Sequence, residues 1–135
     1  MLKRSLGFLT LGLACVLLAG CGAASSLFST TSPFVGTWSG TFTESSASRT
    51  GTLSMTVTKA GLVAGFLTIN TTTTGDVTGQ IVNSGAATLN IGLPNDSFVS
   101  KGTVAINGIQ QLKGNFQDTG GNQPQGVSQI VLSKQ

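Results

Sequence analysis

From residue 34 onward, apolar and polar residues alternate with a period of two, and this pattern constrains the fold more than any other feature. In the first such segment, Phe34, Gly36, Trp38, Gly40 and Phe42 share one face, and hydroxyl-bearing residues occupy most of the other. The alternation returns in segments 52–58, 77–81, 87–93, 98–106, 109–116 and 127–132. It predicts strands with one buried and one solvated face, and no helical pattern follows residue 21.

Short turn signals separate these segments, at 59–61, 74–76, 83–85, 94–96, 107–108 and 118–126. Asn107-Gly108 is the strongest, because both residues tolerate the positive φ of a type I′ hairpin. The run Thr71 to Thr74 is interpreted as a strand end leading into the turn at Gly75 and Asp76.

The count of segments predicts about eight strands joined by short connections, and therefore an all-β fold. We expect a small antiparallel up-and-down barrel, with two small packed sheets as the alternative. Closure would remove the exposed strand edges, which this chain has few charged residues to protect. Eighteen threonines after residue 20 favour strands, and the numerous glycines would allow sharp coiling and bends.

The first 21 residues have the parts of an export signal. Residues 1–4 include two cations, residues 5–17 are almost wholly apolar, and the segment ends in Leu18-Ala19-Gly20-Cys21. This tetrapeptide resembles the lipobox of bacterial lipoproteins. The resemblance implies that the Gly20–Cys21 bond is cleaved and that Cys21 carries a diacylglyceryl group and a further acyl chain such as palmitate. An ordinary secretory signal, with Cys21 incidental, is the alternative.

The resemblance also sets the expected organisation of the chain: a signal peptide over 1–20, a flexible lipid-anchored tether over 21–33 and the barrel over 34–135. It implies a cell-envelope location. Gly22, which follows the lipidated residue, implies sorting to the outer membrane if the organism has two membranes. Because Cys15 would be removed with the signal peptide, the mature chain would contain no disulfide.

The remaining charges indicate neither a nucleic-acid partner nor a polybasic membrane patch. After residue 20 the chain has five scattered cations and four scattered anions, a net charge of +1. No later apolar run is long enough to cross a bilayer, so the lipid alone is expected to anchor the protein. A transmembrane barrel is not expected either, because the outer faces are polar and aromatic girdles are missing.

The segment Gly36-Thr37-Trp38 resembles the Gly-x-Trp signature that opens the first strand of lipocalin-like (calycin) and avidin-like barrels. In those families the Trp closes one end of the barrel, and an Arg from a late strand often lies against it. Here the last strand carries Lys134 instead, and Arg49 is misplaced for that role. The resemblance supports a barrel topology and implies no particular ligand.

Catalytic chemistry is not indicated. Histidine is absent, and the mature chain has no free thiol, so the usual general base and the common metal ligands are missing. The four carboxylates lie in different strands or turns, and their spacing brings no pair together. The segment 118–122 lacks the alternating oxygen ligands of a calcium loop. No catalytic, metal or cofactor residues are therefore predicted.

Three functional hypotheses follow. The first is a non-enzymatic, lipid-anchored cell-envelope lipoprotein that acts as a structural or interaction module, with an unknown protein partner. The second is a lipocalin-like carrier of a small apolar ligand. In both cases the aromatic residues Trp38, Phe42, Phe66 and Phe98 are expected inside the barrel, either filling it or lining a cavity. The third, an enzyme, would need an unforeseen pocket around Asp76, Asp96 or Asp118.

Overall fold

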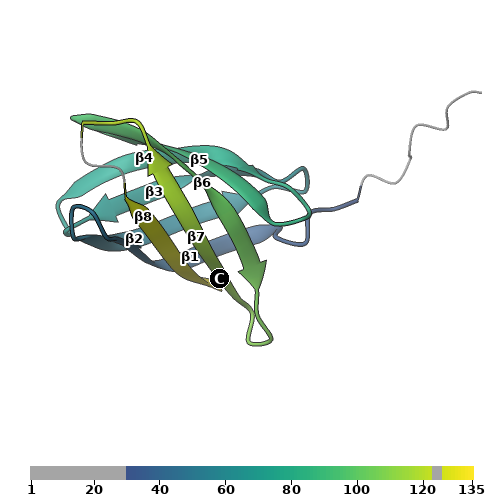
Figure 1. The fold of residues 1–135 in the computed structure, drawn as a ribbon. Helices are drawn as coiled ribbons and strands as arrows, with labels where there is room; N and C mark the ends of the chain where they lie inside the picture. Colours follow the sequence, from purple (N-terminus) through teal and green to yellow (C-terminus); the bar gives the residue numbers. More distant parts are fainter. Residues whose placement is uncertain (1–29, 123–125) are drawn as a thin grey trace, which may run out of the picture.

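A computed structural model describes residues 30–122 and 126–135 and shows a closed antiparallel β-barrel, confirming the predicted all-β fold (Figure 1). The predicted signal peptide, the predicted cleavage site at Gly20 and the predicted lipidation site at Cys21 lie outside the described residues. The strands are β1 (Gly36–Glu44), β2 (Arg49–Val57), β3 (Leu62–Ile69), β4 (Thr73–Ile81), β5 (Ala86–Leu93), β6 (Asp96–Ile106), β7 (Gln111–Thr119) and β8 (Val127–Lys134).

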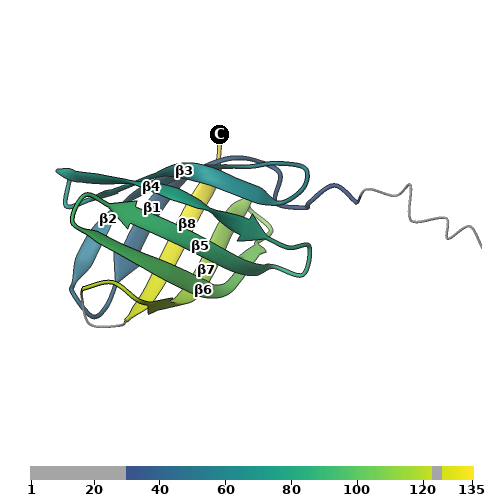
Figure 2. The same ribbon diagram turned by 90° about the horizontal axis from the view of Figure 1, so that it is seen from above.

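Each strand pairs with its neighbours in sequence, and pairing between β1 and β8 closes the barrel. Trp38 in β1 therefore lies opposite Met55 of β2 on one side and Lys134 of β8 on the other. Seen from above, the strands of the near and far walls cross at an angle, as expected for tilted strands in a closed sheet (Figure 2). The up-and-down topology leaves no unpaired sheet edge.

The two-residue alternation sorts side chains between the interior and the solvent. Twenty apolar residues, with members from every strand, form one buried cluster. Threonines cover much of the outer wall of β1 to β4, where Thr41 lies opposite Thr52 and Thr52 lies opposite Thr68. This separation explains how a domain with few charges keeps a polar surface.

One predicted turn was misplaced. Gly75 and Asp76 lie within β4, and the turn falls earlier, at 70–72, where Asn70 and Thr71 have φ values of 48° and 62°. Asn tolerates the left-handed region, and the turn needs two successive residues there. The Asn-Thr pair, rather than the glycine, therefore ends β3.

The turn at Asn107-Gly108 also differs from the prediction. Neither residue has a positive φ; instead Gln110 does, at 58°, so the connection is a longer turn than a two-residue type I′ hairpin. The Asn107 side-chain oxygen accepts hydrogen bonds from the backbone N–H groups of Ile109 (3.1 Å) and Gln111 (2.9 Å). Asn107 thus stabilises the turn through its side chain.

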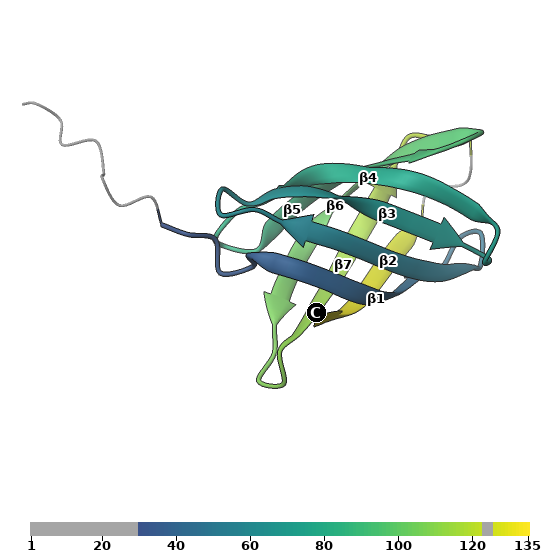
Figure 3. The ribbon, with the colours of Figure 1, turned by 180° about the vertical axis from the view of Figure 1, so that it is seen from behind.

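The barrel has two distinguishable ends. We call the tether end the one with the first described residues, the turns 58–61, 82–85 and 107–110, and the end of β8 (Figures 1 and 3). We call the carboxylate end the opposite one, with the turns 45–48, 70–72 and 94–95 and the segment after Thr119. The described residues include four acidic side chains. Three of them lie in strands close to the carboxylate end: Glu44, Asp96 and Asp118.

Candidate functional site

The interior of the barrel is almost completely filled. The cavity between the two walls measures about 10 Å³ and is lined by inward-facing residues that include Phe42, Phe116, Ser100 and Ser128. A space of this size is about what one water molecule needs, whereas pockets for small ligands measure roughly 300–1,000 Å³. The described interior therefore has no room for a lipid-sized ligand.

At the tether end, Trp38 closes the barrel. Its side chain has no exposed surface, and the indole N–H donates a hydrogen bond to the backbone oxygen of Phe34 at 2.7 Å. The Nζ atom of Lys134 lies 5.6 Å from the ring centroid, within the range of a cation–π interaction. Lys134 thus takes the position against Trp38 in which the resemblance to lipocalin-like barrels implies an Arg.

Gly36 makes this arrangement possible. A Cβ atom at this position would lie 2.7 Å from Cε of Lys134, closer than carbon atoms approach without displacement. Its φ of 137° also falls in a region that side-chain-bearing residues rarely adopt. The Gly-x-Trp segment therefore works as a unit, because the glycine leaves room for the cation that covers the indole.

The chain just before β1 belongs to this closure. Ser32 is buried, its backbone N–H donates to the oxygen of Lys59 at 2.9 Å, and its hydroxyl accepts from the N–H of Phe34 at 3.2 Å. Thr30 accepts a hydrogen bond from the side chain of Asn83 at 3.0 Å. Residues 30–33, predicted as part of the flexible tether, are thus held against the barrel.

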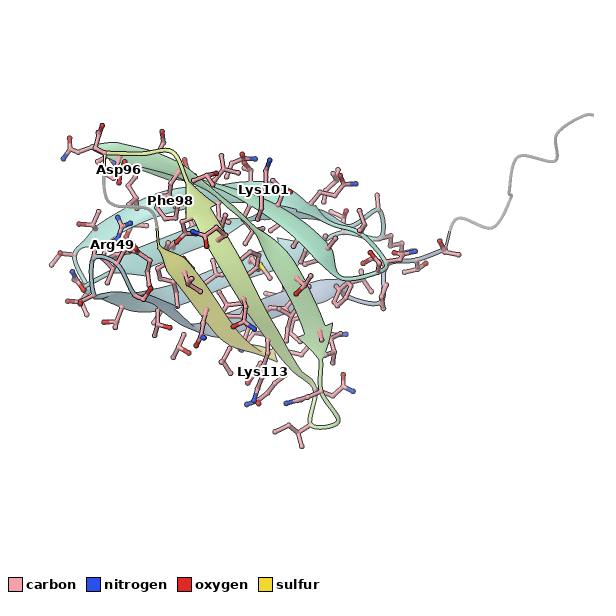
Figure 4. All side chains as sticks on the ribbon, in the orientation of Figure 1. Arg49, Asp96, Phe98, Lys101 and Lys113 are labelled. Carbon is pink, nitrogen blue, oxygen red and sulfur yellow. The ribbon has the colours of Figure 1, made fainter. Side chains whose placement is uncertain are left out.

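At the carboxylate end, Arg49 connects three strands. Its Nε lies 2.5 Å from Oε2 of Glu44, and its Nη1 lies 3.6 Å from Oδ2 of Asp96 (Figure 4). The guanidinium also stands over the ring of Phe98, 5.1 Å from the centroid. Glu44 in β1, Arg49 at the start of β2 and Asp96 at the start of β6 therefore form an ionic cluster.

The surroundings hold this cluster in place. The side chain of Glu44 is 1 % exposed and that of Asp96 11 % exposed, against 14 % for Arg49. The backbone N–H of Asn122 donates to Oδ1 of Asp96 at 2.9 Å, whereas Oδ2 of Asp96 accepts no hydrogen bond. The guanidinium of Arg49 contacts two carboxylates and the ring of Phe98. These contacts join β1, β2 and β6, and the cluster therefore closes this end of the barrel.

Burial alone would raise the pKa of Glu44, yet its pKa is lowered from the ordinary value of 4.5. Hydrogen bonds from the Ser46 hydroxyl and the Arg49 guanidinium, together with the positive charge of Arg49, outweigh the loss of solvation. Glu44 is accordingly a carboxylate at neutral pH, and this excludes it as a general acid under those conditions.

A second polar group lies deeper, between β6, β7 and β8. Asp118 accepts a hydrogen bond from Ser100 at 2.5 Å on one carboxylate oxygen and another from Ser128 on the other. All three side chains are buried, with 5 % of Asp118 exposed. Both serines also line the small interior cavity. A carboxylate is thus accommodated inside the barrel by hydroxyl groups rather than by a cation.

Of the four aromatic residues predicted to lie inside the barrel, three are buried and one is exposed. Trp38, Phe42 and Phe98 are buried in the core, but Phe66 is 61 % exposed on the outer wall of β3, so this part of the prediction was wrong. Apolar residues occupy both faces of β3, and the strand register turns Gly65 and Leu67 inward instead. Phe66 lines an open surface groove of about 450 Å³ between β2 and β4.

The expectation that no carboxylates come together was also wrong. Glu44 and Asp96 are far apart in sequence, yet both bind Arg49: the antiparallel order puts the starts of β2 and β6 at the same end, and the curvature of the closed sheet brings them together. Asp76, by contrast, lies on the outer wall opposite Phe66 and Gly92. Among residues 30–122 and 126–135, no three His, Cys, Asp or Glu side chains lie close enough together to hold a metal ion.

Sequence reasoning missed Arg49, Ser100 and Ser128. The two serines were signalled by the alternation of buried residues along their strands: Ser100 lies two residues after the inward Phe98, and Ser128 two residues before the inward Ile130. Continuing the alternation through polar residues would have placed these side chains inside. Arg49 has no such signal, because its partners depend on how the barrel closes.

Comparison of the chain with protein-family models, with curated proteins and with solved structures gave no match. In the part of the chain that the structure describes, no helix is long and apolar enough to cross a membrane. The fold and the two closed ends are thus the observations from which a function can be argued.

Proposed function

We propose that this protein is a non-enzymatic, lipid-anchored lipoprotein of the cell envelope, in which the barrel acts as a rigid structural or interaction module. The single observation that favours a module over a carrier is the filled interior, with its cavity of about 10 Å³. The lipobox-like segment ending in Cys21 supports the anchor, and the described chain begins at the barrel end closed by Trp38.

The structural engagement of the described ionic groups supports the non-enzymatic part of the proposal. Arg49 and Glu44 neutralise each other, and Asp118 is enclosed by two serines. Glu44 lines an open surface groove beside Val127 and Gln129, and the lining of this groove holds no second carboxylate. The charged residues of the carboxylate end are better suited to hold strands together.

The anchor is tested by metabolic labelling with an alkyne fatty acid. The wild type is expected to incorporate the label and the Cys21→Ser variant to lose it. Cys15→Ser is the matched control, because that residue lies in the predicted signal peptide and its loss should leave labelling intact. Equal labelling of wild type and Cys21→Ser would contradict lipidation at this residue.

A lipocalin-like carrier is the second candidate, and the eight-stranded antiparallel barrel is compatible with it. Native mass spectrometry of the purified mature protein distinguishes the two. The proposal predicts the mass of the lipidated chain with no further molecule, and no displacement of a fluorescent fatty acid. A stoichiometric small apolar molecule would support the carrier and contradict the packed module.

A further inference from the structure

Most charged side chains of the described barrel lie near one of its two ends, with cations at the tether end and most anions at the carboxylate end; Lys101 and Asp76 lie on the outer wall. Lys59 lies in the 58–61 turn, Lys134 at the end of β8 and Lys113 near the start of β7. The turns 58–61, 82–85 and 107–110 contain no acidic residue. The opposite end holds Glu44, Asp96 and Asp118 against the single cation Arg49.

The tether end also exposes large apolar side chains. Among the described residues, Ile109 is 74 % exposed at the tip of the β6–β7 turn, Leu62 is 54 % exposed at the start of β3 and Val82 is 42 % exposed after β4. The β6–β7 hairpin projects from the barrel on this side (Figures 1 and 3). Exposed apolar residues beside lysines are the combination that anionic lipid surfaces bind.

The path of the chain brings this end toward the anchor. Thr30, the first described residue, is hydrogen-bonded to Asn83 in the 82–85 turn. Eight residues lie between it and Cys21, so nine Cα–Cα steps limit the distance between the lipid and this turn to about 30 Å. The connection permits contact with the bilayer without enforcing it, so the charges and apolar residues of the barrel decide its orientation.

We propose that the tether end is a membrane-docking face that seats the barrel on an anionic phospholipid surface, with Ile109, Leu62 and Val82 in the interfacial layer and Lys59, Lys113 and Lys134 beside the headgroups. This inference rests on the proposed lipid anchor. The anchor holds the tether end near the bilayer and so raises its effective concentration there, which allows a small face to bind. The carboxylate end then points away from the membrane, since an anionic surface repels it.

The test compares Ile109→Trp with Asn95→Trp in the lipidated protein; Asn95 is exposed in the 94–95 turn at the opposite end. Vesicles contain equal parts of phosphatidylcholine and brominated phosphatidylglycerol, whose bromine quenches nearby tryptophan. Trp38 gives the same background in both variants. We expect quenching of Ile109→Trp to be at least roughly twofold stronger than that of Asn95→Trp. Equal quenching would overturn the proposal.

Charge variants give the second arm. The pair Lys59→Gln and Lys113→Gln should remove the difference in quenching, whereas Lys101→Gln should preserve it, because Lys101 lies in the middle of β6 on the outer wall (Figure 4). An effect of Lys101→Gln as large as that of the pair would show that only net charge matters, and would overturn the docking face.

Flotation with neutral phosphatidylcholine vesicles tests the lipid anchor independently of the docking face. If the protein floats but the two tryptophan variants are quenched equally, the docking face fails and the anchor stands. If neutral vesicles do not float the protein, the anchor fails, and quenching is measured at high concentrations of anionic vesicles. The docking face then stands only if Ile109→Trp is quenched more strongly, and fails if neither variant is quenched.

Discussion

The two ends of the barrel are closed by different kinds of interaction. At the tether end the indole ring of Trp38 fills the opening, and Lys134 lies over the ring. The indole N–H donates a hydrogen bond to the backbone oxygen of Phe34. At the carboxylate end Arg49 holds two carboxylates, and Asp118 is enclosed by serines. The comparison teaches that an apolar closure depends on volume, whereas an ionic closure depends on each charge keeping its partner.

The largest expected effect comes from removing the apolar closure. Trp38→Ala deletes a ring with no exposed surface, and it should lower the free energy of unfolding by about 3–5 kcal/mol. Urea denaturation followed by circular dichroism measures it without the lost fluorophore. Trp38→Phe should cost less because it keeps most of the volume. A loss below about 1 kcal/mol for Trp38→Ala would show that the ring does not close the barrel.

The ionic closure should respond differently. Arg49→Met leaves Glu44 and Asp96 buried without their cation, and it should lower the free energy of unfolding by about 3 kcal/mol. Adding Glu44→Gln and Asp96→Asn should restore part of this loss, because the uncompensated charges are removed. Denaturation of the single and triple variants measures both steps. A triple variant less stable than Arg49→Met would contradict the ionic account.

A smaller effect is expected at the inner carboxylate. Ser128→Ala removes one of the two hydroxyl donors to Asp118 and should lower the free energy of unfolding by about 1–3 kcal/mol. Ser133→Ala is the matched control on the same strand, because Ser133 is exposed and its loss should change stability by less than about 0.5 kcal/mol. Equal losses for the two serines would argue against a structural role for the inner carboxylate.

The smallest effect concerns pH. Because folding lowers the pKa of Glu44, the stability that this group contributes is present above its ordinary value of 4.5 and is lost as pH falls through the lower folded-state value. Glu44→Gln should therefore lose less stability than the wild type over that acidic interval. Denaturation curves at several pH values provide the comparison, and identical pH profiles would exclude Glu44 as a contributor.

Much of the fold could be predicted from the sequence because the two-residue alternation persists through most strands. It predicted the barrel and the buried positions of Trp38, Phe42 and Phe98. It failed for Phe66 because the apolar residues of β3 face both ways, so periodicity does not define the buried face. The turn at Asn70 was missed because glycine at position 75 gave the stronger local signal.

The carboxylate end could not be predicted because its contacts join residues distant in sequence. Asp96 reaches Arg49 only when the sheet has closed, and no local pattern encodes that distance. The inner Asp118 was accessible to reasoning, since its parity with Phe116 directs it inward. It was missed because Asp118 was assigned to the predicted turn at 118–126, whereas β7 continues to Thr119.

The interior of the barrel is packed and both of its ends are closed. A crystal structure of the purified mature protein tests this packing most directly through the electron density between the two walls. We expect the side chains of Phe42 and Phe116 to be in contact and at most one ordered water beside Ser100 and Ser128. Continuous density for an elongated molecule in the interior, with these rings displaced, would contradict the account.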